Sequence, residues 1–172
     1  MQSYLALADP LLFVLLKTIR RAFEPHPSLR WYISDEIAMY LYAYSAGLPA
    51  LNIGTPELCI KVVMDNITDA SRFKSVLKQL LLQGFQQENS SPDVIQMHYP
   101  LSSIHIEFCI MKKAEGNLIW MKNKKGKFTY PLLDPLKIME EHEKEKLPLI
   151  EKKVEELKHN WMKAVVNALL IE

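Results

Sequence analysis

The sequence predicts an α+β fold in which a small mixed sheet is flanked by helices and followed by C-terminal helices. Three observations predict it: short segments that alternate between apolar and polar residues, longer segments with apolar residues at helical spacing, and a globular composition of 49% hydrophobic and 24% charged residues. Alternation is typical of half-buried strands, and helical spacing of amphipathic helices. We expect residues 1–172 to form a single domain, with an α/β core over residues 11–130 and C-terminal helices over residues 131–172.

Helices and strands are interspersed along most of the chain. The helices are expected over residues 11–24, 35–45, 70–83, 135–146 and 148–170. The strands are expected over residues 31–33, 57–64, 94–99 and 104–111, with a lysine-rich hairpin over residues 118–130 that turns at residues 123–126. Gly84 directly follows one of these helices and is a typical stop signal.

Two of the expected strands carry ionisable side chains on their polar faces. Glu57 and Cys59 share one face of the first strand, and His105, Glu107 and Cys109 share one face of the second. If the two strands are neighbours, these side chains form one surface. Enzymes that transfer nucleotidyl groups use carboxylates from adjacent strands to hold divalent metals near a triphosphate.

Four short motifs follow in a recognisable order. They are Gly54-Thr55-Pro56-Glu57-Leu58-Cys59-Ile60, then Gly84-Phe85 at the end of a helix, Ile104-His105-Ile106-Glu107-Phe108, and residues 130–136 ahead of the C-terminal helices. Together with the order of elements, they resemble the nucleotidyltransferase fold of the polymerase-beta superfamily, including its minimal, toxin-type members. The resemblance covers residues 11–145.

The resemblance implies a site whose motifs are altered in this chain. The family's phosphate-binding glycine pair corresponds to Ser34-Asp35, which adds a repelling carboxylate. Glu57 stands at the first acidic position and Glu107 at the third, whereas the second holds Cys59, a soft ligand poorly suited to magnesium. In an active member, the resemblance implies Mg²⁺ at Glu57 and Glu107 and a nucleoside triphosphate as substrate.

The same resemblance implies residues that contact the nucleotide. They are Ser34, Asp35, Thr55 and Lys61. A simpler explanation stands beside it, because any half-solvated sheet carries polar residues on one face. On that interpretation Glu57 and Glu107 are surface carboxylates that pair with Lys61, and this structural interpretation is favoured.

The cysteines favour a reducing compartment. Cys59 and Cys109 lie within expected strands rather than at loop anchors, so we expect no disulfide framework and a cytoplasmic location. Together with His98 and His105 they match no zinc-binding spacing. The favoured interpretation is that the two cysteines are small, buried or half-buried hydrophobic residues of the strands. The apolar run over residues 11–16 is too short to span a bilayer, and we expect neither an export signal nor a membrane span.

The charge distribution limits nucleic-acid binding. The chain has 21 basic and 20 acidic residues, which argues against a dedicated double-stranded DNA binder. Positive charge is concentrated at Lys112, Lys113, Lys122, Lys124, Lys125 and Lys127. With Trp120 and Phe128 interleaved, Lys122, Lys124, Lys125 and Lys127 are candidates for contact with single-stranded nucleic acid. The favoured interpretation is a solvated turn, in which these lysines keep a sheet edge soluble and prevent aggregation.

Three functions fit the sequence. The favoured one is a nucleotidyltransferase-like domain that lacks intact transfer activity and binds a nucleotide, or a protein partner through its C-terminal helices. The second is an active, divergent metal-dependent transferase that uses Glu57, Glu107 and a further carboxylate, Asp65 or Asp93. The third is an unrelated α+β interaction module whose strand order imitates the family.

Overall fold

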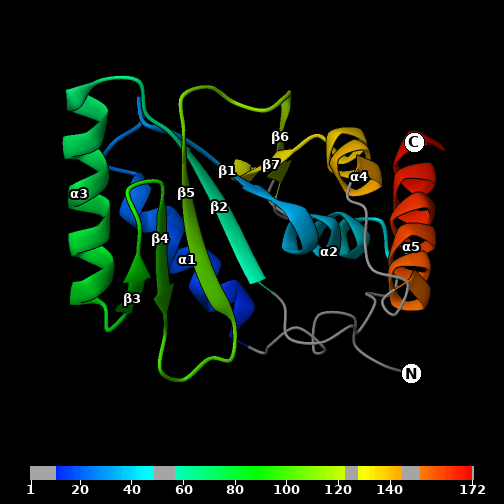
Figure 1. Ribbon diagram of the computed structural model, residues 1–172, viewed down its shortest axis with the longest axis horizontal. Coiled ribbons are helices and arrows are strands. Elements are labelled where there is room, and N and C mark those ends of the chain that lie inside the picture. Colours follow the sequence, from blue (N-terminus) through cyan, green and yellow to red (C-terminus); the bar gives the residue numbers. More distant parts are fainter. Residues whose placement is uncertain (1–10, 49–56, 123–127, 145–151, 172) are drawn as a thin grey trace.

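The structure, a computed structural model, describes residues 11–48, 57–122, 128–144 and 152–171. In these ranges five helices surround a mixed sheet of seven strands in the order β3-β4-β5-β2-β1-β7-β6 (Figure 1), and the expected α+β fold class is confirmed. The helices are α1 (Leu12–Phe23), α2 (Asp35–Ser45), α3 (Ile67–Leu82), α4 (Pro135–Lys144) and α5 (Lys152–Ile171). The strands are β1 (Arg30–Ser34), β2 (Glu57–Val63), β3 (Gln86–Ser90), β4 (Val94–His98), β5 (His105–Met111), β6 (Leu118–Lys122) and β7 (Phe128–Leu133).

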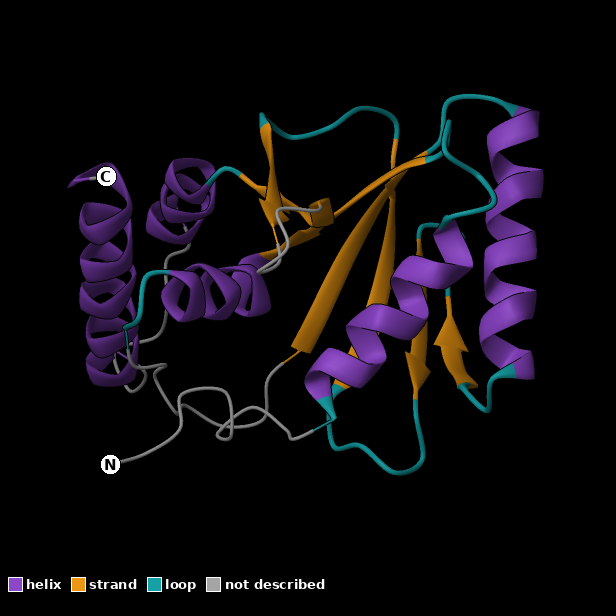
Figure 2. Cartoon of the chain, turned by 180° about the vertical axis from the view of Figure 1, so that it is seen from behind, coloured by secondary structure: helices purple, strands orange, loops and turns teal. Residues whose placement is uncertain are grey.

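The two faces of the sheet are covered differently. Strand alternation puts Leu58, Ile60 and Val62 of β2 on one face, where all three are fully buried. Helices α1 and α3 cover this face; Phe73 of α3, for example, meets Phe108 of β5 edge to face with ring centroids 5.6 Å apart. Figure 2 shows α1 crossing the sheet on this side, with α3 beside it. The apolar faces of the central strands therefore make the core, and their polar faces are directed away from it.

Helices α2, α4 and α5 form a separate group (Figure 1). The apolar stripe of α5 is buried within it: Met162 and Val165 are 3% and 0% exposed, and the ring of Trp161 lies 5.1 Å from that of Tyr40 in α2. This side of α5 is therefore part of the core. Among the described residues, no helix combines the length and apolar character needed to cross a membrane.

Some elements differ from those expected. Strand β3 was not expected because its five residues are all polar and exposed, so no alternation marks it. Helix α3 begins three residues earlier than expected, where the Asn66 side chain accepts a hydrogen bond of 2.8 Å from the Asp69 amide and acts as N-cap. The first turn carries little apolar periodicity, which is why its start was misjudged.

The hairpin also extends further than expected. Strand β7 continues through Pro131 to Leu133, past residue 130, and lies parallel to β1. The sequence did not predict this extension because proline has no N–H to donate a hydrogen bond to a neighbouring strand, so Pro131 argues against a strand. The expected turn at residues 123–126 lies outside the described residues.

A buried hydrogen bond ties α2 to the sheet. The Tyr42 hydroxyl donates to the Leu133 carbonyl at 2.8 Å, and the side chain is 4% exposed. Burial, reinforced by the nearby carboxylate of Asp134, raises the pKa of Tyr42, so the phenol stays protonated and remains a donor.

Replacing Tyr42 with phenylalanine should lower the free energy of unfolding by about 1 kcal/mol, because a buried carbonyl loses its donor while the ring is retained. The matched control is Tyr44→Phe on the same helix, where the side chain is 52% exposed and little change is expected. Chemical denaturation of both variants measures the difference. Equal stability of the two would show that the Tyr42 hydrogen bond contributes nothing.

Candidate functional site

The two acid-bearing strands lie side by side. Strands β2 and β5 pair in parallel, and in this register Glu57 faces His105, Cys59 faces Glu107 and Lys61 faces Cys109. Paired residues in adjacent strands project to the same side of a sheet. The carboxylates of Glu57 and Glu107 therefore share one face, two residue pairs apart along the strands.

This face forms the floor of a cleft of about 340 Å³. Its walls come from the start of α2 and from α4 and α5, the helix group in Figure 1. The lining residues are Asp35, Glu36, Glu57, Cys59, Lys61, Glu107, Cys109, Ile138, Glu141, His142, Lys158 and Met162. The volume lies in the range of small-molecule sites, about 300–1,000 Å³.

The cleft carries an excess of negative charge. Five carboxylates line it, against two lysines and one histidine. Lys158 Nζ lies 3.5 Å from Glu36 Oε1 and joins α5 to α2, so part of the positive charge is already neutralised. Like charges in a cleft with low-dielectric walls reinforce one another, and a free polyanion would be repelled. A ligand with positive charge, or an anion accompanied by a cation, fits this field.

The start of α2 holds a strained residue. Asp35 has φ of +62°, a left-handed conformation that favours glycine and costs other residues free energy. The backbone here thus takes a shape suited to glycine although the residue is an aspartate. The carboxylates of Asp35 and Glu36 occupy the first turn, where the helix dipole favours anions. They stand where a phosphate would otherwise be favoured.

Lys61 lies on the floor of the cleft and forms an ion pair with Glu115, which is not among the lining residues. Its Nζ is 3.5 Å from Glu115 Oε1, and the same carboxylate oxygen accepts a hydrogen bond of 2.9 Å from the Tyr32 hydroxyl. Burial lowers the pKa of Lys61, but the surrounding negative groups, including the carboxylates of Glu115 and Asp35, outweigh burial and raise the pKa overall, so the ammonium stays charged.

The two thiols touch at the centre of the floor. Cys59 Sγ and Cys109 Sγ are 3.8 Å apart, and Cys109 Sγ lies 3.3 Å from Glu107 Oε1. The contact with Cys109, together with burial, raises the pKa of Cys59. Conversely, the Cys59 thiol stabilises the thiolate of Cys109 and lowers its pKa, against burial and the Glu107 carboxylate.

The chemistry of this floor differs from that of a two-metal site. A neutral, buried thiol at Cys59 offers no ligand to a hard divalent cation. Among the described residues, no group of three or more histidine, cysteine and acidic side chains is arranged to hold a metal ion.

The candidate residues from the sequence are only partly brought together. Asp35, Glu57, Cys59, Lys61 and Glu107 all line the cleft. Ser34 pairs with Cys59 and so lies on the same face of the sheet, but it is fully buried and is not among the lining residues. Thr55, Lys124, Lys125 and Lys127 lie outside the described residues. Lys122 is exposed at the end of β6, away from the cleft lining.

Several lining residues were not anticipated. Glu36, Glu141, His142, Lys158 and Met162 come from helices, and the last four lie more than thirty residues after Glu107 in the sequence. The acidic pair Asp35-Glu36 at a helix start was the one available signal. Helical spacing in α4 and α5 indicates which residues are apolar but not which polar ones face a distant strand.

Replacing Asp35 with glycine should raise the free energy of unfolding by about 1 kcal/mol, because the left-handed conformation then costs little. Asp35→Ala is the control: it removes the same carboxylate but keeps the Cβ atom, and it should not stabilise the protein. Thermal or chemical denaturation separates them. A stabilised alanine variant would assign the effect to charge and not to backbone strain.

Alkylation by iodoacetamide should modify Cys109 before Cys59, since the thiolate is the reactive form and Cys109 has the lower pKa of the two. Cys59→Ala should slow the labelling of Cys109, because it removes the hydrogen bond that stabilises the thiolate. Peptide mass spectrometry over a time course measures both rates. Faster labelling at Cys59 would contradict the assigned order.

Comparisons with known proteins identify the fold. No protein-family model and no curated protein matches the sequence. Among solved structures, the lincosamide antibiotic adenylyltransferase LnuA, in its lincomycin-bound form, is similar with 12% identity and a TM-score of 0.57, over 92% of this chain and 98% of that one. The antibiotic-resistance factor ANT(2'')-Ia is similar with 8% identity and a TM-score of 0.56, over 94% and 92% of the two chains. The chain thus has the nucleotidyltransferase fold.

Proposed function

We propose that this protein binds a nucleoside triphosphate in the cleft, as a complex with one Mg²⁺ ion, and does not transfer the nucleotidyl group. The observation that carries the proposal is the floor of the cleft. Glu57 and Glu107 share its surface, while the neutral thiol of Cys59 stands at the second acidic position of the family motif.

The donor set fits one hard cation and not two. Mg²⁺ is commonly held by one or two carboxylates together with substrate phosphates. Glu57 and Glu107 would supply the carboxylates, and the triphosphate the remaining oxygens. Transfer through a two-metal clamp needs more oxygen ligands than this pair provides. The ion would neutralise phosphate charge when bound.

The charge of the cleft supports the need for a cation. Five carboxylates would repel a bare triphosphate, and Lys61 and Lys158 already lie near Glu115 and Glu36. With Mg²⁺ bound, the net charge of the ligand falls and the two lysines and His142 can approach the phosphates. Binding should therefore depend steeply on Mg²⁺.

The similarity to LnuA and to ANT(2'')-Ia supports counting the C-terminal helices as part of the site. It extends over more than nine-tenths of this chain in both cases. Since α4 and α5 contribute Glu141, His142 and Lys158 to the cleft, they would cover a nucleotide bound on the sheet.

An active transferase is the second candidate, and a specific residue favours it. The carboxylate of Asp35 lines the same cleft and acts electrostatically on both Cys59 and Lys61. It is a better candidate for a third acidic ligand than Asp65 or Asp93, neither of which is among the described lining residues.

Isothermal titration of ATP and CTP tests binding. In the presence of Mg²⁺ we expect saturable binding to the wild type, weakened about tenfold or more by EDTA or by Glu107→Gln, since one lost metal–carboxylate contact is worth at least about 1.4 kcal/mol. Asp93→Asn, at an exposed acid outside the cleft lining, is the matched control and should bind normally. Equal binding with and without Mg²⁺ would contradict the proposal.

Turnover decides between the two candidates. With triphosphates labelled at the α-phosphate, we expect no transfer to protein, RNA or small acceptors by the wild type. Transfer that disappears in Glu107→Gln and Asp35→Asn would select the active transferase instead. Cys59→Asp restores the second acidic position and should strengthen the dependence of binding on Mg²⁺.

A further inference from the structure

A second pocket lies at the opposite end of β1 from the cleft. It has a volume of about 420 Å³ and is bordered by the end of α1, the start of β1 and strand β6. The cleft begins at Asp35, directly after β1, whereas this pocket includes Arg30, its first residue. The described linings of the two share no residue, so the pocket is a separate place on the molecule.

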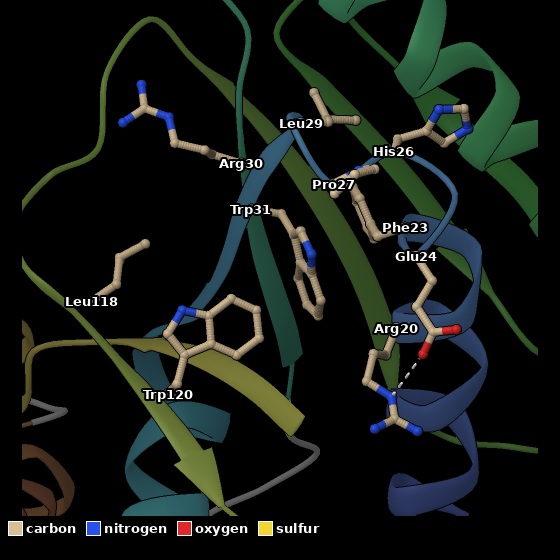
Figure 3. A pocket seen from close by; sticks show the side chains of 10 residues that line it. All are labelled: Arg20, Phe23, Glu24, His26, Pro27, Leu29, Arg30, Trp31, Leu118 and Trp120. Carbon is tan, nitrogen blue, oxygen red and sulfur yellow. Dashed lines mark ion pairs between the residues drawn. The ribbon is translucent and has the colours of Figure 1, made fainter. Parts of the chain in front are cut away.

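Two indole rings form part of its wall. Figure 3 shows Trp31 projecting from β1 and Trp120 from β6. One side of Trp31 is fixed by Phe23, whose ring stacks on it at 4.7 Å with an interplanar angle of 13°. Trp31 is 8% exposed and Trp120 is 47% exposed, so one ring is rigid and the other is accessible. Such surfaces favour stacking with a flat ligand.

Two guanidinium groups add positive charge to the same pocket. Arg30 is exposed at the start of β1, and Arg20 lies on α1 (Figure 3). Glu24 is the one carboxylate of the described lining, and its Oε1 is 3.8 Å from Arg20 Nε, beyond hydrogen-bond distance. Arg20 Nε is buried without a hydrogen-bond partner among the described residues, although buried donors are normally satisfied. Arg20 is thus partly engaged by Glu24, and Arg30 is the exposed cation of the lining.

We infer that this pocket binds a small planar aromatic anion, a ring that carries a phosphate or a carboxylate. The ring stacks on Trp120 beside the Trp31–Phe23 pair, and the anionic group contacts the guanidinium of Arg30 in the same lining. Arginine is suited to this role because its planar fork donates two hydrogen bonds to one carboxylate or phosphate. A cationic ligand would meet aromatic faces too, but the two guanidinium groups would repel it.

Titration calorimetry with phenyl phosphate tests the inference, with phenol and inorganic phosphate as the two halves of the ligand. Phenyl phosphate should bind at least tenfold more tightly than either half, because ring and anion are recognised together. Trp120→Ala and Arg30→Gln should each weaken its binding about tenfold. Ile119→Ala is the matched control: Ile119 neighbours Trp120 on β6, is 45% exposed and is not among the pocket residues.

Three results with small ligands would overturn the inference. They are the absence of phenyl phosphate binding to the wild type, unchanged binding in Trp120→Ala whose circular dichroism spectrum is native, and displacement of phenyl phosphate by ATP–Mg²⁺ with Trp120 intact. Tighter binding of a single-stranded oligonucleotide that is equally sensitive to Trp120→Ala would also overturn it, since the ligand would then be nucleic acid. Nucleotide binding in the cleft should be unaffected by Trp120→Ala, so failure here leaves the proposed function standing.

Discussion

The parallel pairing of β2 with β5 is the constraint on which the remainder of the site depends. Alternating side chains mean that a slip of one residue would move Glu107 to the opposite face. The register is fixed from the other side of the sheet, where Ile60 and Phe108 face each other and are buried under α1 and α3. Core packing thus determines that Cys59, and not a carboxylate, lies opposite Glu107 on the floor of the cleft.

Local patterns in the sequence predicted most of the strands but not their contacts. Clean alternation was sufficient to predict β2 and β5, and their pairing agreed with the resemblance to nucleotidyltransferases. Strand β3 was missed because polar residues on both faces leave no periodic signal. The contribution of α4 and α5 to the cleft could not be predicted, since the orientation of a helix against a distant strand depends on tertiary packing. Asp35 was also hidden, because its side chain gives no sign of a left-handed backbone.

Two features of the cleft both disfavour a triphosphate bound with two metal ions. Acids at the start of α2 occupy the region where a phosphate would be favoured, and Cys59 withholds a hard ligand from the floor. In the proposed function, both features disfavour a triphosphate held by two metals, while Glu57 and Glu107 would hold one. The left-handed conformation of Asp35 costs free energy, and it persists because the surrounding structure holds it.

Anomalous diffraction from crystals grown with ATP and Mn²⁺, a substitute for Mg²⁺, would test nucleotide binding without transfer most directly. One manganese peak between the carboxylates of Glu57 and Glu107, with an intact triphosphate beside it, is the expected result. Two manganese peaks in the cleft, a cleaved nucleotide, or nucleotide bound elsewhere on the molecule would contradict it.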